Sequence, residues 1–116
     1  MTTVPLSEYA FTKLDGSGNG TVRLGPTAHG VVWNPTVASI KATGAIPAGL
    51  ATCTVYAGSS ATDDNFVDAT YDVTSAATDA IAGNVLRLGG YLYAVWSGGT
   101  PGATATLSVA GTKEIP

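Results

Sequence analysis

Residues 15–20, with the sequence DGSGNG, carry the side chains in this chain that best fit a metal-binding motif. Asp15, Ser17, Asn19 and Gly20 fall at the first, third, fifth and sixth positions of an EF-hand calcium loop. The fit ends there, because the twelfth position, which needs a bidentate glutamate, is Pro26, and the ninth is the positively charged Arg23. The segments on both sides alternate with period two, which indicates strands and not helices. We therefore interpret DGSGNG as a loop that joins two antiparallel strands, with glycines that supply positive φ angles.

A second candidate for cation binding is a cluster of oxygen-bearing side chains in the middle of the chain. Its members are Asp63, Asp64, Asn65, Asp68 and Asp72. Carboxylate and amide oxygens are calcium ligands, so the cluster could bind Ca²⁺. The same residue types are typical of a solvated loop in which Asp and Asn bond to nearby backbone N–H groups. The composition favours the loop, and both interpretations stay open on the sequence alone.

Nucleophilic catalysis has few candidate residues in this sequence. His29 is the single histidine and Cys53 the single cysteine, so a zinc site would need carboxylate ligands as well. Cys53 stands between two threonines in an alternating segment, which suits a small buried side chain better than a nucleophile. The sequence has no G-x-S-x-G elbow and no G-x-G-x-x-G phosphate loop. We expect neither enzymatic activity nor a cofactor.

The surface chemistry of the chain follows from its low charge. Of its 116 residues only 11% are charged, against about 25% in an ordinary soluble domain. A surface of Thr, Ser, Gly and Ala costs less to desolvate than an ionic one, so the composition favours a protein that is covered by neighbours in an assembly. The net charge of −3 and the scattered basic residues indicate that the protein does not bind nucleic acid.

The cysteine count and the first residues bear on the compartment. A single cysteine cannot form an intrachain disulfide. The N-terminal segment has neither the cationic nor the apolar region of a signal peptide, and no stretch approaches the roughly 20 apolar residues of a membrane span. We expect a protein that folds in a reducing cytosol and has no membrane partner.

Short alternating segments separated by Gly and Pro dominate the sequence. We predict strands over residues 6–13, 20–24, 30–33, 36–43, 51–57, 66–73, 84–88, 91–97 and 104–109. Gly89-Gly90 predicts a two-residue hairpin turn, and only residues 74–82 could be helical. Seven to nine short strands predict an all-β fold, a single antiparallel β-sandwich of jelly-roll-like or immunoglobulin-like type over residues 8–116.

Aromatic side chains could form an exposed platform for sugars, and the candidates are Trp33, Tyr91, Tyr93 and Trp96. In residues 91–97 the even-numbered positions, with Trp96, lie on one face of the predicted strand, and the odd-numbered positions lie on the other. At least one of these faces must be core, since large aromatic side chains dominate core burial. For any one of these aromatic residues the core is the favoured place.

Three segments carry a resemblance to a known group of proteins. They are residues 20–26 with 31–33 (GTVRLGP and VVW), 53–58 (CTVYAG) and 88–107, of which AVWSGGTPGATATL is the most specific phrase. Together they resemble small β-domain virion structural proteins of tailed phages, especially phages that infect actinobacteria. The resemblance spans residues 20 to about 111 and includes no catalytic motif. It implies a virion component made in the cytoplasm of a bacterial host.

The resemblance implies one of several places in the particle. The first expectation is a capsid decoration or cement protein that binds the major capsid protein on the outside of the head. A tail- or baseplate-associated module that binds a receptor or glycan is the alternative, and a cellular carbohydrate-binding module is a third. A symmetric shell predicts a homo-oligomer, with a homotrimer as the natural guess. We expect residues 1–7 to be an N-terminal arm that docks on a neighbouring subunit through Val4, Pro5 and Leu6.

Overall fold

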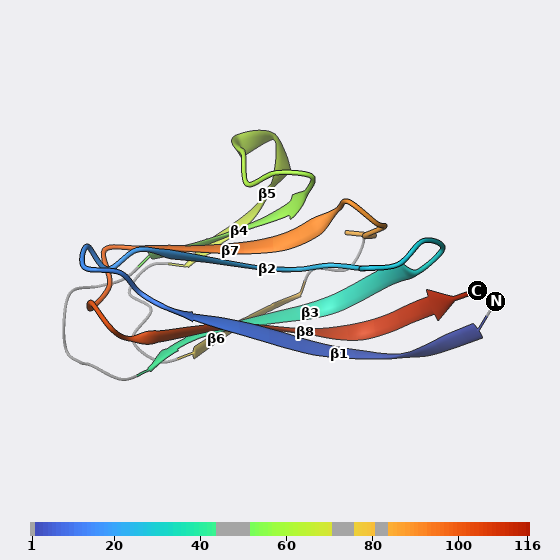
Figure 1. Cartoon of the computed structure of the whole chain (residues 1–116), viewed down its shortest axis with the longest axis horizontal. Coiled ribbons are helices and arrows are strands. Elements are labelled where there is room, and N and C mark those ends of the chain that lie inside the picture. Colours follow the sequence, from blue (N-terminus) through green and yellow to red (C-terminus); the bar gives the residue numbers. More distant parts are fainter. Residues whose placement is uncertain (1, 44–51, 71–75, 81–83) are drawn as a thin grey trace.

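The chain forms two antiparallel β-sheets that pack face to face as a sandwich (Figure 1). The computed structural model describes residues 2–43, 52–70, 76–80 and 84–116. The first sheet, called the long sheet below, has the strand order β1-β8-β3-β6, and the short sheet has the order β2-β7-β4-β5. The all-β sandwich expected from the sequence is confirmed.

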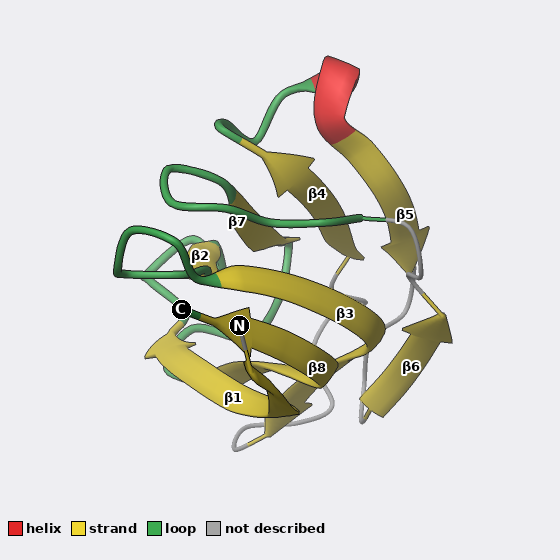
Figure 2. Ribbon diagram, turned by 90° about the vertical axis from the view of Figure 1, so that its right-hand side faces the viewer, coloured by secondary structure: helices red, strands yellow, loops and turns green. Residues whose placement is uncertain are grey.

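The two sheets differ in the length of their strands. The long sheet consists of β1 (Thr2–Lys13), β8 (Thr104–Ile115), β3 (Val32–Thr43) and β6 (Ala76–Ala80). The short sheet consists of β2 (Gly20–Leu24), β7 (Tyr91–Ser97), β4 (Thr52–Gly58) and β5 (Phe66–Thr70), and the 3₁₀ turn η1 (Asp63–Asn65) precedes β5. Figure 2 shows the sandwich end-on, with η1 projecting beyond the short sheet.

Period-two alternation puts one face of each sheet in a shared core. Leu92 and Trp96 on the inner face of β7 are fully buried, and Leu107 and Val109 of β8 belong to the same core cluster. The Thr and Ser residues that alternate with them in β8 are only partly buried. Burial of apolar area contributes about 25 cal/mol per Å². This shared core holds the two sheets together and decides which side chains are left for the outer faces.

The first residues of the chain belong to the long sheet and not to a separate arm. β1 begins at Thr2 and pairs with β8 without a break up to Lys13. Leu6, expected as a docking contact, is 2% exposed and packs in the core. Pro5 is tolerated because β1 is an edge strand, which has no hydrogen-bond ladder on its open side. Removal of residues 2–7 would therefore weaken the fold itself.

Several local predictions were wrong. The segments expected as two strands over residues 30–33 and 36–43 contribute to the single strand β3, and residues 84–88 form only an isolated bridge at Leu86 instead of a strand. Ala76–Ala80, inside the range that could be helical, form β6 and pair with residues 37–41 of β3, while residues 74, 75, 81 and 82 lie outside the described residues. The segments around Gly89-Gly90 do not form a hairpin with each other. The N–H of Gly90 donates to the Arg87 carbonyl at 2.8 Å, but Leu86 bridges to Trp33 of the long sheet, and β7 pairs with β2 and β4.

The DGSGNG loop links the two sheets. The expected pairing of its flanking strands is corrected, because β1 lies in the long sheet and β2 in the short sheet. Asp15 Oδ1 accepts hydrogen bonds from the backbone N–H groups of Ser17, at 2.8 Å, and Asn19, at 3.0 Å. The loop also bonds to the turn between β7 and β8, since the N–H of Gly99 donates to the carbonyl of Gly18 at 2.9 Å. The two inter-sheet connections at this end of the sandwich therefore support each other.

Gly18 is the residue of this loop that tolerates substitution least. Its φ of +77° lies in the left-handed region, which costs a residue with a Cβ atom about 1–2 kcal/mol. A Cβ atom there would also overlap the carbonyl oxygen of Gly99. We expect Gly18→Ala to lower the free energy of unfolding by about 2 kcal/mol or more in urea denaturation. Gly16→Ala is the matched control, because a Cβ atom at Gly16 meets nothing within 4 Å. Equal losses in the two variants would contradict this account of the loop.

Asp15 makes the stability of the loop depend on pH. Hydrogen bonds from the N–H groups of Asn19 and Ser17 hold the pKa of its carboxyl group below the ordinary value of 3.8. Because the folded-state pKa is depressed, the carboxylate stabilises the fold above the unfolded-state pKa, and this contribution is lost as the pH falls through the folded-state pKa. The melting temperature of the wild type should exceed that of Asp15→Asn near neutral pH, and the gap should close well below pH 3.8. A gap that stays constant over this range would contradict the role of the charge.

Candidate functional site

The residues considered for catalysis lie apart in the fold. Cys53 in β4 is 0% exposed and packs in the core, as its sequence context predicted. His29 is exposed on the connection between β2 and β3. Among the described residues, no group of three or more His, Cys, Asp or Glu side chains could hold a metal ion. No helix in the described ranges is long and apolar enough to cross a membrane.

The acidic cluster begins in a tight turn ahead of β5. Asp63 and Asp64 are exposed in η1. The side-chain amide of Asn65 donates to a backbone carbonyl of the same loop at 2.8 Å, so it fixes the loop backbone. Asp68 lies in β5, and Asp72 lies outside the described residues. Residues 63–65 thus have the geometry of a solvated turn.

The two tryptophans are core residues. Trp96 is 0% exposed and Trp33 is 6% exposed, so their favoured placement in the core is confirmed, and neither ring is available to an exposed platform for sugars. Trp96 lies on the inner face of β7 opposite Cys53, and Trp33 lies in β3 within the same core cluster. Tyr91 and Tyr93, the other two candidates for that platform, alternate with the core residues of β7 and lie on the outer face of the short sheet.

A row of aromatic side chains crosses this outer face. The strand register places Arg23 of β2 opposite Tyr93 of β7, and Tyr93 opposite Tyr56 of β4. Tyr56 is in turn opposite Phe66 of β5, and Tyr91 precedes Tyr93 in β7 on the same face. Neighbouring strands lie about 4.8 Å apart, so the row extends roughly 14 Å across four strands. We call Arg23, Tyr56, Phe66, Tyr91 and Tyr93 the aromatic row.

The side chains of the aromatic row hold one another in place. The guanidinium carbon of Arg23 lies 4.3 Å from the centroid of the Tyr91 ring, a cation–π contact. Tyr91 and Tyr93 meet edge to face with their centroids 5.8 Å apart, and the centroids of Tyr56 and Phe66 lie 6.4 Å apart. The Tyr93 hydroxyl donates to the carbonyl of Ser59 at 3.2 Å. A partner that binds this row meets side chains that have already lost much of their conformational freedom.

The aromatic row is open to solvent and carries little charge. Phe66 is 54% exposed, Tyr56 and Tyr91 are half-buried, and Tyr93 is 9% exposed beneath its neighbours. The outward positions around the row in β2, β4 and β7 are Thr21, Thr52, Thr54, Val95 and Ser97. Among all outward positions of β2, β4 and β7, Arg23 is the one charged residue. A face that is aromatic at its centre, with hydroxyl groups around it, has the composition of a binding surface.

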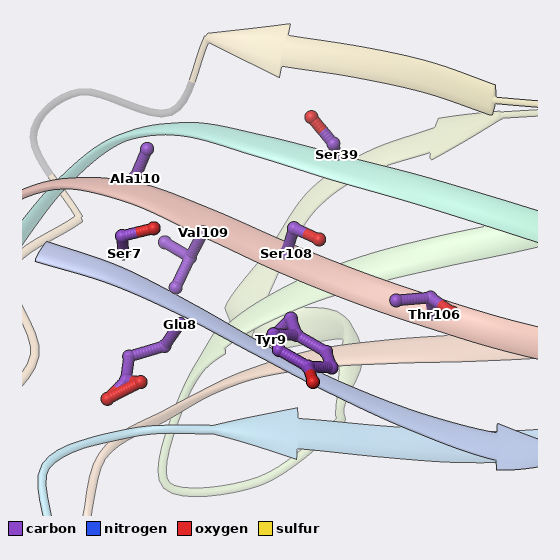
Figure 3. A pocket seen from close by; sticks show the side chains of 8 residues that line it. All are labelled: Ser7, Glu8, Tyr9, Ser39, Thr106, Ser108, Val109 and Ala110. Carbon is purple, nitrogen blue, oxygen red and sulfur yellow. The ribbon is translucent and has the colours of Figure 1, made fainter.

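The outer face of the long sheet presents a second pair of aromatic residues among hydroxyl groups. Tyr9 and Phe11 of β1 are 69% and 63% exposed. The register places Tyr9 beside Ser108 of β8, which in turn lies beside Ser39 of β3. Figure 3 shows the shallow hollow between these strands, lined by Ser7, Glu8, Tyr9, Ser39, Thr106, Ser108, Val109 and Ala110. Its lining holds one carboxylate and neither histidine nor cysteine, so it does not combine a nucleophile with a histidine base.

Sequence reasoning missed Tyr9, Phe11, Tyr56 and Phe66 as surface residues of interest. The available signal was alternation, which places Tyr56 on the face of its strand opposite Cys53 and Val55. The missing information was the pairing of strands that are distant in sequence. That pairing brings Tyr56 and Phe66 together with Tyr93 and Arg23.

No protein-family model matches this sequence, and no curated protein is significantly similar to it. The chemistry of the two outer faces then carries the functional inference.

Proposed function

We propose that the protein is a non-enzymatic structural component of a phage virion, a capsid decoration protein that binds the outside of the head and stabilises it. The aromatic row is the observation that carries the proposal, as the surface that contacts the major capsid protein. The resemblance of residues 88–107 to structural proteins of tailed phages supports the virion as the setting.

The chemistry of the aromatic row suits attachment to protein. Aromatic side chains and arginine dominate the energetic hot spots of interfaces, and both are present in the row. Each Å² of apolar contact contributes about 25 cal/mol before the costs of association. Since Arg23 is the one charged residue at the outward positions of β2, β4 and β7, little ionic desolvation opposes binding there. A shell offers many equivalent sites, so a subunit that bridges neighbours stabilises the particle even with modest affinity at each contact.

A tail- or baseplate-associated module that binds a host glycan is the second candidate function. It is favoured by the same tyrosine rings, which share the outer face of the short sheet with the hydroxyl groups of Thr21, Thr54 and Ser97. Aromatic rings with polar groups beside them could accept the apolar face of a sugar ring. Titration with cell-wall saccharides, followed by NMR, separates the two functions. Glycan binding predicts shifts at Tyr91 and Tyr56, whereas decoration predicts none.

Immunogold labelling of the phage particles that carry this chain tests the proposed location. An antibody raised to the recombinant protein is applied to intact particles and to particles from which the protein is genetically deleted. Decoration predicts gold scattered over the heads of intact particles and none on the deleted ones. Gold confined to the tail or its tip would contradict decoration and favour the second candidate.

A further inference from the structure

The strand β1 gives the long sheet an edge that differs from the other edges of the sandwich. β1 has 12 residues and pairs on one side only, with β8. The other described edge strands, β2, β5 and β6, have 5 residues each, and an irregularity interrupts the pairing of β5 with β4. Short strands and bulges keep sheet edges from pairing with other chains. β1 has neither protection, since its register with β8 is unbroken.

The free backbone groups of β1 belong to its odd-numbered residues. Just beyond the strand, the N–H of Leu14 donates to the carbonyl of Ala103 at 2.9 Å, and the carbonyl of Leu14 accepts from Gly102 at 2.9 Å. Leu14 thus continues the ladder toward β8. Successive residues of an unbroken strand turn their backbone groups to opposite sides. The even-numbered residues of β1 therefore bond to β8, and the odd-numbered ones turn N–H and C=O to the open edge.

The position of Pro5 is consistent with this alternation of backbone groups, and it limits the part of the β1 edge that can pair with another strand. It is odd-numbered, so its missing N–H would have faced the open side, where proline is tolerated. The part of the edge whose backbone can both donate and accept hydrogen bonds then begins at Ser7. The residues that turn their N–H and C=O groups to this open edge are Ser7, Tyr9, Phe11 and Lys13.

We propose that two copies of this chain pair through residues 7–13 of β1, antiparallel about a twofold axis at Ala10. The two long sheets then form one continuous sheet with four strands from each copy. In this register Tyr9 of each copy faces Phe11 of the other copy, and Lys13 faces Ser7.

The side chains favour this register over its neighbours, since an axis at Tyr9 or Phe11 would oppose one aromatic pair where the axis at Ala10 opposes two. Directly opposed aromatic residues are a stabilising cross-strand pair, and Tyr9 and Phe11 are 69% and 63% exposed in the single chain. On the inner side of the strand Glu8 faces Thr12, so no like charges are opposed. A twofold axis at Glu8 would instead place Pro5 opposite Phe11 and lose a ladder hydrogen bond.

This interface is independent of the proposed function, because the aromatic row lies on the other sheet and stays free in the dimer. It also differs from the homotrimer that a shell position suggested, since edge pairing of two identical antiparallel strands generates a twofold axis.

Sedimentation equilibrium of the full chain over a range of concentrations is the first test. The monomer has a mass of 11.6 kDa, and the wild type should approach twice that mass as its concentration rises. Phe11→Lys should raise the dissociation constant of the dimer by about tenfold or more, because it removes both aromatic pairs. Leu88→Lys is the control, since Leu88 is 44% exposed and lies outside β1. A monomer at every concentration, a trimer, or a dimer that Phe11→Lys leaves unchanged would overturn the proposal.

Disulfide trapping tests the register itself. With the axis at Ala10, the two residues at this position form a close pair with Cα atoms about 4.5 Å apart, which a disulfide can join. The two copies of Thr12 would lie roughly 13 Å apart along the strands. Under mild oxidation with oxidised glutathione, Ala10→Cys should become a covalent dimer, whereas Thr12→Cys and the wild type, with Cys53 buried, should not. Failure of Ala10→Cys to crosslink, or crosslinking of Thr12→Cys, would overturn the register.

Discussion

Trp96→Ala should lower the free energy of unfolding by about 3–5 kcal/mol. Trp96 is 0% exposed on the inner face of β7, an inner strand of the short sheet, so truncation leaves a large cavity between the sheets. Its indole N–H has no hydrogen-bond partner among the described residues, so the loss is one of packing. Since the whole domain is stable by only about 5–15 kcal/mol, we expect a large shift of the urea midpoint.

Tyr91→Ala is the control for this loss, because Tyr91 lies half-buried on the outer face of the same strand. We expect its cost to be about 1 kcal/mol, from the ring contacts with Tyr93 and Arg23. Similar midpoints for Trp96→Ala and the wild type would contradict the assignment of Trp96 to the core. They would also return Trp96 to the candidates for a binding surface.

Phe66→Ser should weaken binding to heads that lack the protein by about tenfold or more. Phe66 is 54% exposed at the end of the aromatic row, and its ring packs against that of Tyr56. Its exposed edge can therefore insert into a pocket of the capsid protein while the contact with Tyr56 holds the ring in place. Loss of an aromatic hot-spot residue costs about 2 kcal/mol of binding free energy or more, and every 1.4 kcal/mol is tenfold in the dissociation constant. Cosedimentation of the labelled protein with heads from a deletion phage measures the effect.

Leu88→Ser is the matched control, since Leu88 is an exposed apolar residue that lies outside both sheets. We expect its binding to equal that of the wild type. Circular dichroism should show unchanged folding for both variants, because neither side chain belongs to the core cluster. Wild-type affinity of Phe66→Ser, or an equal loss in Leu88→Ser, would contradict the aromatic row as the contact surface.

Much of the fold could be predicted from alternation and turn residues. Residues 20–24 and 91–97 form strands with the expected bounds, because each is a short segment of strand-forming residues between Gly-containing turns. Residues 74–82 misled the prediction because alanine favours helices in isolation. In the folded chain, Ala76–Ala80 are paired with β3, and such tertiary pairing overrides local preference.

The candidate site could be predicted only in part. Alternation in residues 91–97 separates Trp96 from Tyr91 and Tyr93, but both faces of that strand are apolar, so the pattern does not tell which one is core. The answer lies in the opposite sheet, which covers the even-numbered face. Likewise, no local signal places Phe66 beside Tyr56, because an irregularity in the β4–β5 register sets that contact. Residues 2–7 of the expected arm are part of β1, because β8 extends to Ile115 and provides a partner for them.

A symmetry-averaged cryo-EM reconstruction of the phage head tests the central claim most directly. The account predicts density for the sandwich on the outer surface of the shell, with the short sheet and the rings of Tyr56, Phe66 and Tyr91 against capsid subunits. A bare shell would contradict the proposed decoration function. A sandwich bound with its short sheet facing solvent would contradict the aromatic row as the docking surface.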